Sequence, residues 1–136
     1  MKKLLLLFVF LLGTQVHLKA QNAPLNKQQT VDYIEKLLKA SYYFKNFNVD
    51  DLTVENKTLN IIFSDGAKSR FNLSKISTLT IKEDGSDKQF YIYSPEFENP
   101  VLPHIQTKED AKRLKKALEH LIEILKTEKD TDPFGD

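Results

Sequence analysis

Residues 107–126 read TKEDAKRLKKALEHLIEILK, and this stretch combines a cap, a favourable charge order and a helical period. Thr107 is a favoured N-cap residue, and the acids Glu109 and Asp110 follow it where the helix dipole is positive. The apolar side chains then recur every three or four positions, at Ala111, Leu114, Leu118, Leu121 and Leu125. This spacing predicts a long amphipathic helix whose apolar stripe closes one end of a sheet.

Upstream of this helix, apolar residues alternate with polar ones in short runs, which is the pattern of strands with one buried face. The turn sequences between the runs include residues 55–57 (ENK), 65–66 (DG) and 84–86 (DGS), where Gly and Asn can accept a positive φ. The apolar members are Leu52, Val54, Leu59, Ile61, Phe63, Phe71, Leu73, Leu79, Ile81, Phe90 and Ile92. We therefore expect an antiparallel meander of five or more strands.

A second helix precedes the strands. Asn26 and Gln29 have the spacing of an N-cap and its reciprocal partner, and apolar residues follow at helical intervals over residues 27–40. After the strands, the prolines of the next segment predict a surface loop that ends the sheet, at Pro95, Pro100 and Pro103. The predicted fold is α+β, with an N-terminal helix, the meander and a closing C-terminal helix.

The first 20 residues predict a secretory signal peptide. Lys2 and Lys3 precede an apolar run from Leu4 to Leu12, and the segment ends in the small residue Ala20. A run of about nine apolar residues is too short for a bilayer, which needs roughly 20. We therefore expect cleavage after residue 20, no transmembrane segment after processing, and an extracytoplasmic location, periplasmic or secreted, in a bacterial host.

Residues 21–126 have the size of one domain, and residues 127–136 predict a disordered acidic tail. Cleavage of the signal peptide removes Lys2, Lys3 and Lys19, which reduces the 20 basic residues to 17. Because 19 acidic residues remain, the formal net charge becomes −2. That balance excludes the basic footprint of a nucleic-acid-binding protein. The chain has no cysteine, which excludes disulfides and thiol chemistry.

The layout of short strands closed by a long helix, in which residues 111–114 (AKRL) lead into residues 117–122 (ALEHLI), resembles the pleckstrin-homology-like superfold. The resemblance covers about residues 31–126 and looks most like uncharacterised secreted bacterial proteins that carry this domain alone. It implies a scaffold that binds peptides or proteins along a strand edge and the closing helix. The superfold usually has seven strands, and its phosphoinositide-binding members cluster basic residues where residues 55–58 offer one lysine. Phosphoinositide recognition is therefore not expected.

Two tyrosines form the candidate binding site. Tyr91 and Tyr93 alternate with Phe90 and Ile92, so we expect them on the outer face of the sheet, where tyrosines can bind a peptide or a glycan. In the alternative, the first helix covers them and they belong to a second core. Their strand, residues 89–93, is expected to be an unpaired edge beside the closing helix. Further aromatic residues crowd the segment after the first helix, at Tyr42, Tyr43, Phe44 and Phe47.

The sequence predicts no catalytic, metal or cofactor site. Beyond the leader, His104 and His120 lack the spacing of zinc or haem ligands. Glu96 and Glu98 share a loop with His104, but solvated loop glutamates explain them without catalysis. Four glycines leave little room for a phosphate-binding loop or a nucleophile elbow, and neither motif occurs.

The sequence thus predicts a secreted or periplasmic, non-enzymatic binding module for a protein or peptide. The alternative is a small apolar ligand carrier, or an enzyme, on a cone-shaped α+β fold that resembles the cystatin-like group. Because the inward residues are apolar, the pocket of such a carrier should be small and apolar. A further hypothesis, binding to anionic envelope lipid, rests on the basic residues of the closing helix, which are Lys108, Lys112, Arg113, Lys115 and Lys116. Charge opposite an apolar stripe is usually a solvated face instead.

Overall fold

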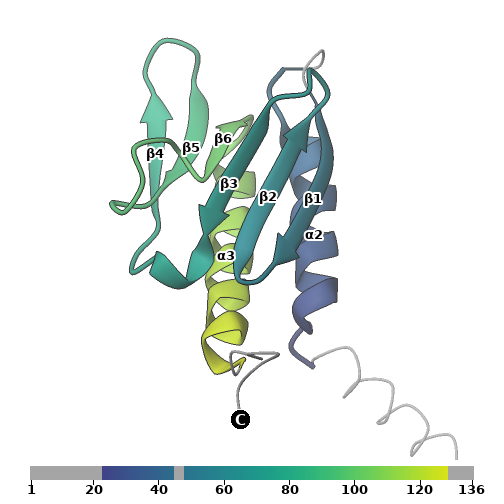
Figure 1. Cartoon of the computed structure of the whole chain (residues 1–136). Coiled ribbons are helices and arrows are strands. Elements are labelled where there is room, and N and C mark those ends of the chain that lie inside the picture. The colour runs from purple at the N-terminus through teal and green to yellow at the C-terminus, as the bar shows by residue number, and fades with distance from the viewer. Residues whose placement is uncertain (1–22, 45–47, 129–136) are drawn as a thin grey trace, which may run out of the picture.

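The computed structural model describes residues 23–44 and 48–128 of the chain. The predicted signal peptide, residues 1–20, and residues 129–136 of the predicted tail lie outside the described residues. The first two residues of the predicted tail are ordered, because Thr127 is the last residue of the C-terminal helix and Glu128 is its C-cap. The described residues form an α+β fold of two α-helices and six antiparallel strands (Figure 1). This confirms the predicted fold class.

The order of elements along the chain places one helix before the strands and one after them. The bounds are α2 (Lys27–Ser41), β1 (Val49–Glu55), β2 (Thr58–Phe63), β3 (Lys68–Asn72), the 3-10 helix η1 (Leu73–Lys75), β4 (Thr80–Asp84), β5 (Gln89–Tyr93), β6 (Leu102–Ile105) and α3 (Lys108–Thr127). The strands form two separate sheets, ordered β1-β2-β3 and β4-β5-β6, instead of a single meander.

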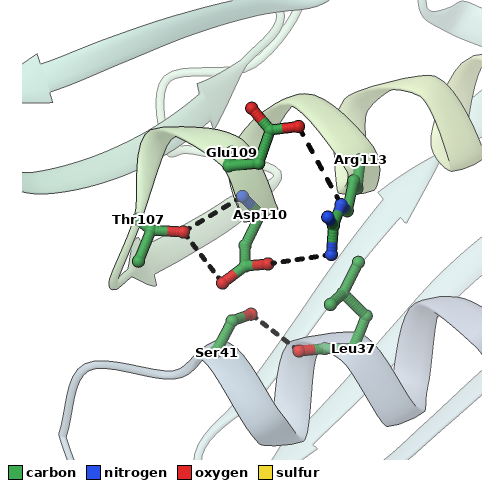
Figure 2. A network of polar contacts seen from close by, with 6 residues as sticks. All are labelled: Leu37, Ser41, Thr107, Glu109, Asp110 and Arg113. Carbon is green, nitrogen blue, oxygen red and sulfur yellow. Dashed lines mark hydrogen bonds and ion pairs between the residues drawn. The ribbon is translucent and has the colours of Figure 1, made fainter.

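Both predicted helix caps are confirmed. Asn26 accepts a hydrogen bond from the Gln29 backbone N–H (2.9 Å), while the Gln29 side chain accepts one from the Asn26 backbone (3.0 Å), which is a complete capping box. At the start of α3 the Thr107 hydroxyl accepts from the Asp110 N–H (3.1 Å) and donates to the Asp110 carboxylate (2.9 Å), as Figure 2 shows. Local sequence therefore determines where both helices begin.

The two helices lie side by side behind the β1-β2-β3 sheet (Figure 1). Lys27 at the start of α2 forms an ion pair with Glu128 at the end of α3 (2.9 Å), so the helices run antiparallel. The face that α3 buries is the predicted stripe together with two neighbours, Ala117 and Ile122. Its buried residues are Ala111, Leu114, Ala117, Leu118, Leu121, Ile122 and Leu125. Helix α3 packs against α2 and against β4, β5 and β6, and α2 packs in turn against β1, so the two helices together join the two sheets into one core.

The β1–β2 and β2–β3 turns use positive φ at the expected residues Asn56 and Gly66, and the first turn also uses it at Lys57, which was not expected. In the first, Asn56 (φ 46°) and Lys57 (φ 62°) are both left-handed, as a two-residue type I′ hairpin requires, and Glu55 pairs with Thr58. In the second, Gly66 has a φ of 84°. In the β4–β5 turn the positive φ falls on Lys88 (52°) and not on the predicted Gly85.

The prediction that the proline-containing segment ends the sheet is wrong, because β6 lies within it. Leu102 pairs with Ile92 and Ile105 pairs with Phe90, so Pro103 and His104 both lie opposite the single residue Tyr91. This is a β-bulge. A bulge interrupts the ladder of backbone hydrogen bonds, which explains how a strand can contain a proline that has no N–H to donate.

The prediction that residues 89–93 form an unpaired edge is also wrong. β5 is the central strand of its sheet and pairs with β4 on one side and β6 on the other. The outer side of β6 carries a further bridge, between Tyr42 and Ile105. The outer side of β4 pairs with no described residue, so β4 is the open edge of this sheet.

Candidate functional site

A pocket of about 450 Å³ opens where the end of α2, the β2–β3 turn and β6 meet. From the first two segments it is lined by Tyr42, Phe44, Phe63, Asp65, Ala67 and Ser69. From the β5–β6 loop and β6 it is lined by Asn99, Pro100, Pro103 and His104. We call this site the aromatic pocket, because ring side chains of three distant segments converge on it.

Backbone hydrogen bonds hold the end of α2 against β6. The Tyr43 N–H donates to the His104 carbonyl (2.8 Å), and the Gln106 N–H donates to the Ser41 carbonyl (2.8 Å). The Ser41 hydroxyl turns back to donate to the Leu37 carbonyl (2.6 Å) in the last turn of the helix (Figure 2). The chain therefore leaves α2 in extended form beside β6 and brings Tyr42 next to His104.

The rings of the aromatic pocket are inclined to one another. The centroids of Tyr42 and Phe63 lie 6.1 Å apart with their planes at 40°, and those of Tyr42 and His104 lie 5.9 Å apart at 81°. Phe44 and His104 are 4.8 Å apart at 67°. Such edge-to-face and tilted pairs contribute about 0.5–1.5 kcal/mol each beyond the burial of their area. The rings are thus arranged as the walls of a box and not as a flat platform.

His104 is held in an unusual backbone conformation at the base of this arrangement. Its φ of 54° lies in the left-handed region, at the bulge of β6. Its Nδ1 lies 2.7 Å from the side-chain oxygen of the buried residue Gln89 and 3.2 Å from the Tyr91 hydroxyl. Because an amide oxygen only accepts, the hydrogen of the neutral ring lies on Nδ1. The bulge therefore directs a fixed tautomer of His104 toward the pocket.

Burial lowers the pKa of His104 below its usual value, and the nearby Asp84 carboxylate only partly opposes this effect. The ring is therefore neutral at pH 7. Burial raises the pKa of Tyr42 above its usual value, and the negative charge of Asp65 raises it further. The field of Asp65 thus reaches the ring of Tyr42.

The predicted tyrosine pair lies beside the aromatic pocket but does not line it. Tyr91 and Tyr93 are half-buried on the outer face of β5, with centroids 6.1 Å apart. The Nζ of Lys82 lies 4.6 Å from the centre of the Tyr93 ring. The main neighbours of α2 are α3 and β1, so the alternative in which this helix covers the tyrosines is not supported.

The sequence did not single out the residues of the aromatic pocket as a site. The signal available was the aromatic crowding after the first helix, and of those residues Tyr42 and Phe44 do line the pocket. Phe47 lies outside the described residues. The sequence places His104 in a surface loop and predicts no binding role for it. Its contribution depends on the bulge and on Gln89, neither of which the residue pattern indicated.

Glu96, which shares the proline-containing segment with His104 and was considered for catalysis, joins two loops. Its carboxylate accepts hydrogen bonds from the Ser77 backbone N–H (3.0 Å) and from the hydroxyls of Ser77 and Ser94. These donors lower the pKa of Glu96 to about 2. Glu96 is exposed, as expected for a loop residue, but its carboxylate is a structural acceptor and not merely solvated.

Two of the five basic residues in the first half of α3 form ion pairs with acids of the same helix. Arg113 lies 4.0 Å from Glu109 and 3.9 Å from Asp110 (Figure 2), and Lys115 forms an ion pair with Glu119. Exposed pairs of this kind contribute little to stability, but they divide the positive charge of the surface. The observed arrangement is that of a solvated helix face.

His120 lies on α3 and donates from Nε2 to the Leu25 carbonyl (2.7 Å), which ties the segment before α2 to this helix. Within the described residues, no three His, Asp or Glu side chains converge in a way that could hold a metal ion. In the same part of the chain, no helix is both long enough and apolar enough to cross a bilayer. Comparisons with models of protein families, with curated proteins and with solved structures found no significant match.

Proposed function

We propose that the protein is a secreted or periplasmic, non-enzymatic binding module for a protein or peptide, and that the aromatic pocket holds an anchoring side chain of the partner. The observation that carries the proposal is the pocket itself, about 450 Å³ in volume and walled by inclined rings. Binding energy in protein interfaces concentrates where one side chain fills a well-packed pocket. The aromatic pocket has this form.

Exposed aromatic residues at the rim support a macromolecular partner. Tyr43 is 39% exposed and Phe44 is 40% exposed, and the two rings contact each other edge to face at 5.2 Å. Exposed apolar side chains that lie together in one patch beside a pocket are typical of an interaction site. A partner that inserts one side chain would cover this rim with its flanking residues.

A small apolar ligand is the second candidate, and the volume of the aromatic pocket favours it, because ligand pockets measure about 300–1,000 Å³. The predicted carrier, however, has its pocket between helix and sheet. In that region the side chains are fully buried and packed together, including Leu59, Ile92, Leu114, Leu118 and Leu121. The carrier therefore ranks second.

We also infer a pleckstrin-homology-like arrangement from the order of the elements. Two antiparallel sheets of three strands precede a C-terminal helix that packs against the second sheet. The departures from the superfold are the six strands, where it usually has seven, and the helix before β1. On this arrangement the strand edge available to a peptide in the second sheet is β4, and not β5 as the sequence suggested.

Selection from a random peptide library tests the proposed function. Ala67 is exposed and lines the aromatic pocket, so Ala67→Phe should fill the pocket without disturbing the core. Lys68→Phe is the matched control, because Lys68 is the exposed neighbour that does not line it. We expect the protein to enrich peptides with a shared anchor residue, and Ala67→Phe to weaken their binding about tenfold or more while Lys68→Phe retains it.

Two results would contradict the proposal. One is a selection that enriches nothing over an unrelated protein. The other is a set of peptides that bind Ala67→Phe as tightly as the unmodified protein, when circular dichroism shows that the variant is folded. Binding of apolar small molecules that Ala67→Phe abolishes, without any enriched peptide, would establish the carrier instead.

A further inference from the structure

The lining of the aromatic pocket carries a single negative charge. Of the described residues that line it, Asp65 alone is charged at pH 7, because burial keeps His104 neutral. One carboxylate oxygen, Oδ1, accepts from the Ala67 N–H (2.9 Å), which closes the turn between β2 and β3. No described residue donates to Oδ2. The carboxylate is thus fixed in direction and retains an oxygen that can accept.

The ring walls complement a positive charge. The face of an aromatic ring is electronegative, and a cation over it gains about 0.5–2 kcal/mol. Tyr42 and Phe44 stand at 62° to each other, and Tyr42 and Phe63 at 40°, so the rings line the pocket from different directions. A sugar, by contrast, would need an open flat ring on which to stack. Inclined rings beside a carboxylate suit a compact or planar cation.

Other side chains fit this site less well. An anionic group would be repelled by Asp65, and an apolar group would remove Asp65 from water without replacing its hydrogen bonds. Between the two cationic side chains, arginine has a planar fork that can donate to a carboxylate while its flat face stacks on aromatic rings. Lysine carries a more strongly hydrated point charge.

From these observations we propose that the aromatic pocket recognises the guanidinium group of an arginine side chain, held between the rings of Tyr42, Phe44 and Phe63 and paired with Asp65. This inference rests on the proposed function and specifies the partner as a peptide or protein segment that presents an arginine.

Titrations of the ¹⁵N-labelled protein with short peptides test this assignment. The probes are acetyl-Gly-Gly-Arg-Gly-Gly-amide and the same peptide with citrulline or with leucine in place of arginine. Citrulline keeps the shape of arginine and removes its charge. We expect the arginine peptide to shift the amide resonances of residues 65–67 and to bind about tenfold more tightly than either of the other two.

The matched variants are Asp65→Asn and Asp84→Asn. Asparagine keeps the turn at position 65, because its side-chain oxygen can still accept from the Ala67 N–H. Asp84 makes the same kind of turn, with its Oδ1 accepting from the Ser86 N–H (3.1 Å), and does not line the aromatic pocket. Asp65→Asn should abolish the preference for arginine over citrulline, and Asp84→Asn should retain it.

The inference is overturned if citrulline or leucine binds as tightly as arginine, if Asp65→Asn keeps the preference, or if the arginine peptide produces no shifts at millimolar concentration. Its failure is distinguishable from failure of the proposed function. Library peptides that lack arginine yet are blocked by Ala67→Phe would leave a peptide-binding pocket with another specificity, whereas a selection that enriches nothing would remove both.

Discussion

His104 combines a left-handed backbone, a buried hydrogen-bond partner and a position against the aromatic pocket. A residue other than glycine in this backbone region costs on the order of 1–3 kcal/mol, and such strain is concentrated at functional sites. Histidine is one of the few residues that tolerates the left-handed region. The sequence offered no sign of this conformation, because φ at position 104 is set by a bulge whose partner strand lies ten residues away or more.

The lowered pKa of His104 predicts a pH-dependent contribution to stability. The unfolded chain binds a proton near pH 6.5, whereas the folded protein binds it at a lower pH. The contribution is therefore present above about pH 6.5 and is lost as the pH falls toward the folded pKa. His104→Asn should flatten the dependence of the free energy of unfolding on pH between about 7.5 and 5, measured by urea denaturation. His120→Asn is the control, and an equal slope in wild type and His104→Asn would contradict the prediction.

The lowered pKa of Glu96 predicts that its hydrogen bonds to Ser77 and Ser94 lose their stabilising effect in acid. Its pKa falls from 4.5 to about 2 on folding, so the stabilisation is complete above about pH 4.5 and is lost as the pH falls toward 2. Glu96→Gln should lower the melting temperature at pH 7, and its difference from wild type should shrink as the pH approaches 2. Glu98→Gln, in the same loop, is the control. Equal melting temperatures for the two variants at pH 7 would show that the hydrogen bonds to Ser77 and Ser94 do not stabilise the fold.

At the scale of elements, the sequence predicted what local interactions determine. Both helix starts depend on residues within one turn of the cap, and the type I′ hairpin depends on Asn56 and Lys57. The alternation of polar and apolar residues gave the wrong secondary structure where contacts with residues distant in sequence determine it. The alternation predicts a strand at Leu73, but this residue is buried in η1. Strand β6 contains Pro103, which no alternation of polar and apolar residues would predict in a sheet.

The cap of α3 predicts a measurable loss of stability. Thr107→Ala removes the acceptor for the Asp110 N–H at the positive end of the helix, so we expect a loss of about 1 kcal/mol in the free energy of unfolding. Urea denaturation at pH 7 measures it. Gln106→Ala is the control, because this exposed neighbour contributes only its backbone N–H, and it should change the stability by less than about 0.5 kcal/mol.

At the scale of the whole molecule, the aromatic pocket assembles from segments that are far apart in sequence, at residues 42–44, 63–69 and 99–104. The pattern of each segment predicts at most its own structure. Which segments meet depends on the bridge between Tyr42 and Ile105, on the packing of α3 against the second sheet, and on the packing of α2 against both α3 and β1. The fold class could therefore be predicted from sequence, while the site could not.

The predicted signal peptide implies that the protein matures by cleavage. We expect protein recovered from outside the cytoplasm of a bacterial host to begin at Gln21, as measured by intact-mass spectrometry and N-terminal sequencing. The apolar run is the determinant, so Leu6→Arg should retain the precursor inside the cell. Intact precursor in the membrane fraction would indicate an uncleaved anchor, and unprocessed cytoplasmic protein would contradict the predicted location.

Intermolecular NOEs between a library-selected peptide and the ¹³C-labelled protein locate the binding site directly. If the aromatic pocket is the site, the anchor side chain of the peptide should show NOEs to ring protons of Tyr42, Phe63 and His104, which line it. NOEs confined to Tyr91 and Tyr93, or to the open edge of β4, would contradict this claim. The binding site would then lie on the outer face or at the open edge of the second sheet.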